Sequence, residues 1–129
     1  MGYQIQQISD HIVALDLIGD FSAEDATNHV LEMDPILERI CKDGEKVHFL
    51  VRTVELGKIS LEGRRSFGER NGDARVGSTA VVGVNRFLKV VAQFIMVASG
   101  KQNIRFFDAA DEASALGWLN SQTNSTPQQ

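Results

Sequence analysis

Hydrophobic and polar residues alternate at the start of the chain in a pattern typical of paired strands. Residues 3–8 and 11–19 each predict a strand, because Val13, Leu15 and Leu17 recur at every second position in the longer run. A serine–aspartate pair separates the two runs and suits a tight turn. The pattern therefore predicts an antiparallel hairpin.

The next segment changes to helical spacing. Ser22 is placed to cap a helix, and Glu24 and Asp25 favour the positive end of the helix dipole. Pro35 interrupts the apolar stripe, so we expect a kink, or a restart with Asp34 as a new cap. The stripe that predicts the buried side of this helix consists of Ala26, Val30, Met33, Leu37 and Ile40.

The middle of the chain predicts two core strands around a weak helix. Residues 47–54 form a nearly continuous apolar run, which is typical of a central parallel strand. Residues 61–70 predict a helix, but Gly63 and Gly68 each cost about 1 kcal/mol relative to alanine. Residues 78–84 predict the next strand of the core.

The last third predicts a strong helix, a short strand and a final helix. Asn85 caps residues 86–99, and Gly100 ends that helix. Residues 104–107 predict a strand, and Asp108 is expected to cap the final helix. The apolar contacts of the final helix are expected from Leu116, Trp118 and Leu119.

The predicted order is β-β-α-β-α-β-α-β-α, which indicates the α/β class. Alternating strands and helices imply a mostly parallel sheet, and the first hairpin supplies an antiparallel edge. We expect one domain over residues 1–120 and a polar, flexible tail over residues 121–129.

Composition narrows the function. The chain has 129 residues, 43% hydrophobic and 23% charged, with a formal charge of −4, and its basic residues are dispersed. A nucleic-acid partner is not expected, since it would require a concentrated basic face. Cys41 is the only cysteine, which suits a reducing compartment. The sequence has no secretory pattern at its start and no apolar run long enough to span a bilayer, so we expect a cytoplasmic protein.

Catalytic and metal-binding patterns are weak. His11, His29 and His48 are far apart and fall on different predicted elements, and His48 is expected to be a buried, hydrogen-bonded ring. Cys41 is expected to be an inert thiol, because only Lys42 is near enough in sequence to activate it. We therefore expect no enzymatic activity, no metal and no cofactor.

The helix over residues 86–99 carries more apolar residues than one sheet-facing side requires. Each residue advances about 100° around the axis, so Arg86, Lys89 and Gln93 form one narrow polar stripe. Val90 and Met96, together with Val97, flank this stripe, where a surface helix is normally polar. The residues expected to pack on the sheet are Phe87, Leu88, Val91, Phe94, Ile95 and Ala98.

Two explanations of the surplus are open. Either neighbouring helices cover these residues, or they form an exposed apolar patch that contacts a lipid-like ligand, a membrane surface, a partner protein or a second copy of the chain. Basic residues beside such a patch suit anionic headgroups, so the protein is expected at the membrane periphery in that case. The candidate contact residues are Arg86, Lys89, Val90, Phe94, Met96 and Val97.

Four stretches in this order resemble the SpoIIAA-like branch of the STAS family, the sulfate transporter and anti-sigma-factor antagonist domains. The resemblance covers most of the chain from Tyr3 to Leu119. The stretches are Phe21–Asp25 at the first helix, Val30–Glu38 with its internal proline, Arg75–Val84 before the third helix, and Ile104–Asp108 with Ala115 and Trp118-Leu119.

The resemblance implies a bacterial, non-enzymatic domain with a sheet of four or five strands and about four helices. It also implies contact with regulatory proteins, apolar ligands or membranes. Anti-sigma-factor antagonists carry an Asp-Ser-Ser-Gly-like phosphorylation motif before the second helix. Here Ser60 lies near the acceptor position, but Ile59 replaces the acid and no glycine follows directly. The alternative function is thus a protein-contact domain switched by phosphorylation of Ser60 or Thr53.

Overall fold

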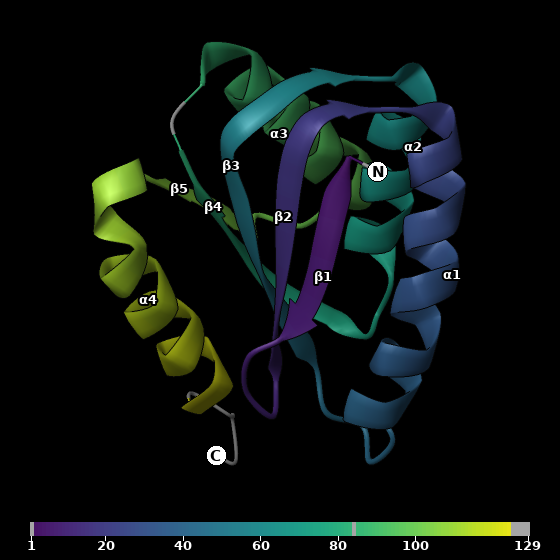
Figure 1. The fold of residues 1–129 in the computed structure, drawn as a ribbon. Helices are drawn as coiled ribbons and strands as arrows, with labels where there is room; N and C mark the ends of the chain where they lie inside the picture. The colour runs from purple at the N-terminus through teal and green to yellow at the C-terminus, as the bar shows by residue number, and fades with distance from the viewer. Residues whose placement is uncertain (1, 84, 125–129) are drawn as a thin grey trace.

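The computed structural model describes residues 2–83 and 85–124 and shows a five-stranded mixed sheet with helices on both faces (Figure 1). Only the first pair of strands is antiparallel, and the other pairs are parallel. The predicted class and element order are confirmed. The elements are β1 (Tyr3–Gln7), β2 (Ile12–Phe21), α1 (Ala23–Ile40), β3 (Val47–Ile59), α2 (Leu61–Gly72), β4 (Val76–Val82), α3 (Arg86–Ser99), β5 (Ile104–Phe107), a 3-10 turn (Ala109–Asp111) and α4 (Glu112–Asn124).

The strand order explains how the helices are distributed. The strands lie side by side in chain order, so every crossover advances across the sheet in the same direction. Right-handed crossovers that advance in one direction place their helices on one face. Helices α1, α2 and α3 accordingly share a face, and α4 covers the other face alone (Figure 1).

The core forms two layers, one on each side of the sheet. Alternate residues of a strand point to opposite faces. In β2, Leu15 points toward α1–α3, whereas Ile12 points toward α4. In β3, Leu50 lies with Ile12 and with Leu119 of α4. Trp118 and Leu116 pack against the same cluster, so the predicted contacts of the final helix are confirmed.

Two details of α1 differ from the prediction. The helix runs unbroken through Pro35, so the restart with Asp34 as a new cap is wrong. Met33 and Leu37, which are buried on either side of the exposed proline, hold both halves on the sheet. Val30 is largely exposed, and His29 takes the buried position instead.

The ends of several elements also differ. β3 continues five residues beyond Val54 to Ile59, because β2 pairs with it as far as Phe21. The Asp108 side chain makes no capping hydrogen bond, since a 3-10 turn separates it from α4. The final helix extends to Asn124, four residues past the expected domain end, and residues 125–129 lie outside the described part.

The caps predicted at Ser22, Asn85 and Gly100 are confirmed, and Ser60 also forms a cap. Ser22 and Asp25 form a capping box at the start of α1, with Ser22 Oγ accepting from the Asp25 amide at 3.1 Å. Ser60 Oγ accepts from the Gly63 amide at 2.9 Å at the start of α2. The side-chain Oδ1 of Asn85 accepts from the amides of Phe87 and Leu88 at the start of α3. Gly100 ends that helix with a φ of 72°, which suits glycine.

Replacing Gly77 with alanine is expected to destabilise the sheet. An added Cβ would overlap the His48 ring, whose Nδ1 accepts a hydrogen bond from the Ser78 amide at 2.9 Å. Because the ring is held in place, we expect a loss of about 1–3 kcal/mol in the free energy of unfolding, measured by urea denaturation. Gly117→Ala is the matched control, because nothing lies within 4 Å of its added Cβ. That change in a helix should stabilise by up to about 1 kcal/mol.

Candidate functional site

The outward side of α3 exposes hydrophobic side chains. Val90, Phe94 and Val97 are 54%, 71% and 67% exposed. Met96 is less exposed than these three, since it is half-buried. Neighbouring helices therefore do not cover this side. Of the two explanations for the surplus apolar residues, the structure agrees with the exposed patch for these three residues.

The placement of Phe87 and Phe94 on the sheet is wrong. Phe87 is 49% exposed, and Phe94 is the most exposed of the large apolar residues. The buried stripe of α3 is narrow, since only Leu88, Val91 and Ala92 are buried. The reason is that α2 and the sheet cover only the inner side of α3 and leave its outward side exposed.

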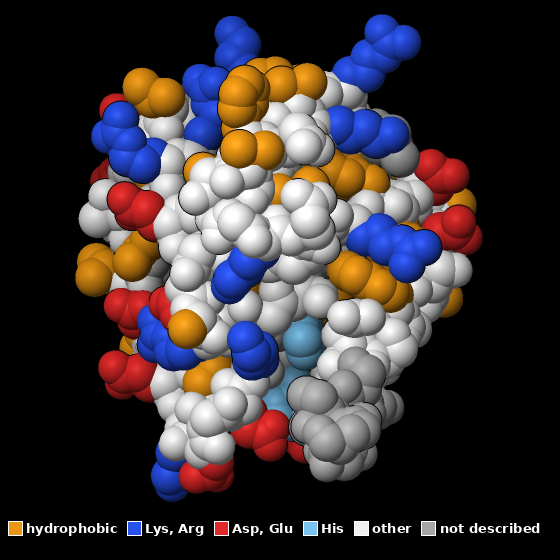
Figure 2. Space-filling model, turned by 180° about the vertical axis from the view of Figure 1, so that it is seen from behind, with side chains coloured by type: hydrophobic (Ala, Val, Ile, Leu, Met, Phe, Trp, Pro, Cys, Tyr) orange, Lys and Arg blue, Asp and Glu red, His pale blue; other side chains and the backbone are white. Residues whose placement is uncertain are grey.

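We call Phe87, Val90, Phe94 and Val97 the outer face of α3. Side chains of this kind gather over α3 in the upper part of Figure 2, with lysine and arginine side chains around them. Arg86 and Lys89 are exposed, and α3 contains no acidic residue. The guanidinium carbon of Arg64 lies 5.8 Å from the centre of the Phe87 ring. The outer face is therefore apolar with a basic rim.

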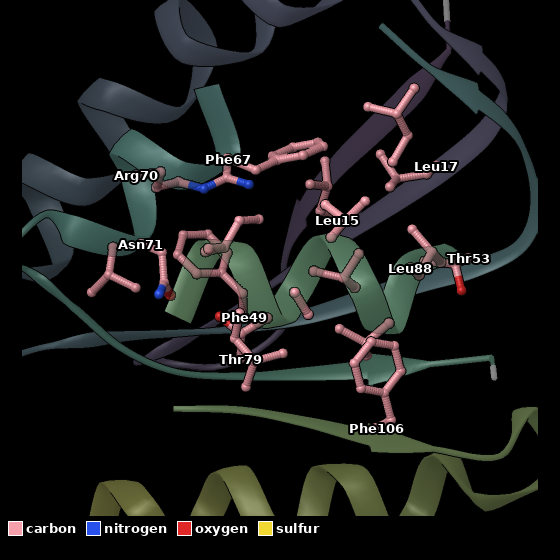
Figure 3. Close-up of a pocket in the computed structure, with 18 residues that line it drawn as sticks. Leu15, Leu17, Phe49, Thr53, Phe67, Arg70, Asn71, Thr79, Leu88 and Phe106 are labelled. Atoms are coloured by element: carbon pink, nitrogen blue, oxygen red, sulfur yellow. The ribbon is translucent and has the colours of Figure 1, made fainter. Parts of the chain in front are cut away.

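A cavity of about 90 Å³ lies beneath α3, between this helix, α2 and the sheet. Figure 3 shows the side chains that line it, which come from both helices and from the strands. Most of the lining is aliphatic or aromatic, including Leu15 from β2, Val81 from β4, Val91 from α3 and Phe106 from β5. An apolar space of this kind stays dry and accepts apolar ligand groups.

Arg70 of α2 is the one charged side chain among the residues that line this cavity. Its guanidinium lies between two rings, with its central carbon 4.8 Å from the Phe49 centroid and 5.2 Å from that of Phe67. Figure 3 shows the group pointing past Phe67 toward Leu15. The Nη1 atom is buried and has no hydrogen-bond partner. Burial lowers the pKa of Arg70 to about 10, so the group stays charged at neutral pH.

The His29 ring packs against the Phe67 ring, on the side of the sheet that α1, α2 and α3 cover. Its Nδ1 is 2.8 Å from the Ala26 carbonyl oxygen, and its Nε2 is buried without a partner. Burial, and next the charge of Arg70, lower the pKa of His29 to about 4. The ring is therefore neutral at physiological pH. The prediction of buried, hydrogen-bonded histidine is confirmed at His48, and His29 was not recognised as a second case.

The two candidate phosphorylation residues differ in accessibility. Ser60 is half-buried and caps α2, beside the exposed Leu61. Thr53 is buried, and its hydroxyl donates to the carbonyl oxygen of Val82 at 3.0 Å. A phosphoryl group on Thr53 would require the middle of β3 to separate from the end of β4. Only Ser60 is accessible in this conformation.

Other reactive groups do not form a second site in the part of the chain that the structure describes. Within residues 2–83 and 85–124, no three acidic, histidine or cysteine side chains are grouped to hold a metal. Burial raises the pKa of the Cys41 thiol, which disfavours the reactive thiolate. Across the same residues, no helix combines the length and apolar character that crossing a bilayer requires.

Solved structures of other proteins are similar to this chain. Among solved structures, the anti-sigma factor antagonist SpoIIAA in its unphosphorylated form is similar, with a TM-score of 0.70 and 15% identity over 92% of this chain and 97% of that chain. An uncharacterised protein of the DUF3478 family from Shewanella loihica, with a SpoIIAA-like fold, gives a TM-score of 0.62 and 22% identity, covering 91% of each chain. Comparison with curated proteins found no match.

The two solved structures are similar in fold along almost the whole length of the chain. The sequence itself gives the family assignment, since the family model described as SpoIIAA-like matches residues 12–120. That range extends from β2 into α4 and includes the outer face of α3 and the cavity beneath it. This chain belongs to the SpoIIAA-like family.

Proposed function

We propose that this domain is a non-catalytic binding module that docks on an anionic membrane surface through the outer face of α3. The observation that carries the proposal is the group of exposed side chains Val90, Phe94 and Val97 on a helix without acidic residues. Burying three such side chains contributes up to about 4.5–9 kcal/mol before the costs of association, at about 1.5–3 kcal/mol each. Arg86 and Lys89 add attraction to anionic headgroups.

Charge favours a membrane over a second copy of the chain. A two-fold dimer places the same patch of both copies against itself. Pairing the outer faces would collect Arg86, Lys89 and Arg64 of both copies at one interface. No acidic residue of α3 offsets that repulsion. An anionic bilayer supplies the opposite charge and an apolar layer together.

Vesicle flotation tests the proposal. The wild-type protein is expected to float with vesicles containing phosphatidylserine and to float less as ionic strength rises, because salt screens the basic rim. The Val90→Asp, Val97→Asp variant should lower the bound fraction by at least about tenfold, since two charges would enter the apolar layer.

The matched control uses α1. Val30→Asp, Leu31→Asp introduces the same two charges at exposed apolar positions on a different helix. This control should float like the wild type. Membrane docking through α3 is wrong if the wild type stays unbound with every anionic vesicle, or if the two double variants lose binding equally.

A second candidate function is contact with a regulatory protein, switched by phosphorylation of Ser60. Its support is the position of Ser60 at the start of α2, where the helix dipole stabilises a phosphoryl group. The similar solved structure of an anti-sigma factor antagonist points the same way. The test is mass spectrometry of the protein isolated from growing cells. A phosphoryl group on Ser60 that is absent from Ser60→Ala supports the switch, and an unmodified Ser60 in all growth phases contradicts it.

A further inference from the structure

Arg70 has no carboxylate partner in the described part of the chain, although it is placed in an apolar layer. The ion pairs of residues 2–83 and 85–124 involve His11, Arg52 and Arg75, and none involves Arg70. Two aromatic rings stack on its guanidinium, but stacking satisfies none of its N–H donors. A buried charge normally has a paired group, because desolvation is costly.

The acids near Arg70 are not paired with it. Asp34, Glu69 and Asp73 line a neighbouring groove together with Arg70. Asp34 and Asp73 face Arg75, whose Nη2 is 2.7 Å from Asp73 Oδ2 and 3.6 Å from Asp34 Oδ1. Glu69 forms no ion pair with Arg70 in the described part of the chain. The guanidinium therefore lies at the edge of the apolar cavity with its Nη1 buried and unpaired.

The cavity beside this guanidinium limits the size of an occupant. Its volume of about 90 Å³ is smaller than the apolar cavities of about 150 Å³ that hold benzene. A straight chain of a few carbons fits without movement of α2 or α3, and the longer chains of the series below fit only as these helices move apart. A guanidinium binds a carboxylate through two parallel hydrogen bonds, which suits an acid at one end of such a chain.

We propose that this cavity binds a small apolar carboxylate, with the hydrocarbon chain among Leu15, Val81 and Val91 and the acid group on Arg70. Each part of the ligand satisfies one part of the site. The chain fills a dry apolar space, and the carboxylate supplies the missing partner of the guanidinium. This inference goes beyond membrane docking, because it uses the inner side of α3 and not its outer face.

The test is an NMR titration of the isotope-labelled protein with straight-chain acids from butyrate to octanoate at neutral pH. At least one acid should shift the amides of Phe67, Arg70 and Val91. Hexanamide, which has a chain but no charge, should bind at least about tenfold more weakly than hexanoate, because it forms no charge-assisted pair. Acetate, which has the charge but almost no chain, should also bind weakly.

Variants of Arg70 separate recognition from a structural role. Arg70→Met should reduce hexanoate affinity about ten- to hundredfold and leave hexanamide binding unchanged. Its melting temperature should stay equal or rise, because a desolvated charge is removed. Arg70→Lys keeps the charge without the two-pronged geometry, so its hexanoate affinity should be intermediate. Arg65→Met, at an exposed position of the same helix, is the matched control and should bind hexanoate like the wild type.

The inference is overturned if no acid of the series shifts these amides, if the wild type binds hexanoate and hexanamide equally, or if Arg70→Met retains hexanoate affinity. The comparison of acid and amide on the wild type needs no variant to fold. Flotation of the ligand-free protein tests the outer face separately. Loss of acid selectivity with intact flotation would therefore reject only the carboxylate site.

Discussion

Replacing Phe21 with alanine is expected to lower the free energy of unfolding by about 3–5 kcal/mol, the cost typical of a large buried aromatic residue. Phe21 is fully buried at the end of β2, with its ring centroid 5.0 Å from that of Phe67 and 5.3 Å from that of His29. Gly63 approaches it so closely that an added Cβ would lie 2.7 Å from the ring. The surrounding backbone has little freedom to close the void, so the upper part of the range is expected in urea denaturation.

The control for this change is Phe94→Ala. Phe94 loses the same atoms but is mostly exposed, so its removal should change stability by less than about 0.5 kcal/mol. A loss at Phe21 no greater than that at Phe94 would contradict the central position of the Phe21 ring. The two variants also distinguish two roles of aromatic residues, because Phe94→Ala should reduce flotation, whereas Phe21→Ala should reduce stability.

Acidification is expected to destabilise the protein through His29. Its pKa is about 4 in the folded state and about 6.5 in the unfolded state, so the unfolded chain binds a proton first as the pH falls. The stability contribution of the neutral ring is complete above about pH 6.5 and declines down to about pH 4, where the loss reaches about 3 kcal/mol. Urea denaturation at a series of pH values measures this slope.

His29→Phe is the informative variant, because it keeps an aromatic ring among Tyr3, Phe21 and Phe67 and cannot titrate. Its stability should fall about 3 kcal/mol less than that of the wild type over the same pH range. His48, whose pKa burial also lowers, contributes in the same direction in both proteins and cancels in the difference. Parallel pH profiles would show that His29 does not titrate on unfolding.

Local sequence signals predicted the frame of the fold well. Ser22, Ser60 and Asn85 each form the capping hydrogen bond that their residue type favours. Alternation in the first two strands and the order of the later elements were sufficient to predict a mostly parallel sheet with one antiparallel edge. Caps and strand alternation depend on neighbours within a few residues, so a single sequence is enough to predict them. Pro35 shows the limit of this reasoning, because tertiary packing on both sides outweighs its local effect.

The site was only partly visible in the sequence. The surplus of apolar residues on α3 indicated an exposed patch, but Phe87 and Phe94 were placed on the wrong side. Helical periodicity gives relative directions around an axis, and it does not say how wide the buried stripe is. The actual stripe is narrow because α2 and the sheet cover only the inner side of α3.

Arg70 was missed altogether. A charged residue in a glycine-containing helix of low apolar content is normally solvated, so its sequence context gave no reason to select it. Phe67 and Arg70 are three residues apart and so share a face of α2, which was the one available signal. The absence of a partner depends in part on a long-range contact, since Asp34 of α1 faces Arg75, and no local pattern encodes that contact.

The agreement between strand order and chain order has a consequence for biosynthesis. Each new strand adds to an edge that the preceding strand has already formed, so the sheet can grow while the ribosome is still extending the chain. The helix α4 emerges after all five strands, and its residues Ala115 and Leu119 pack against Leu50 and Ala80 on its side of the sheet. We therefore expect the nascent chain to expose an apolar sheet face until α4 has left the ribosome.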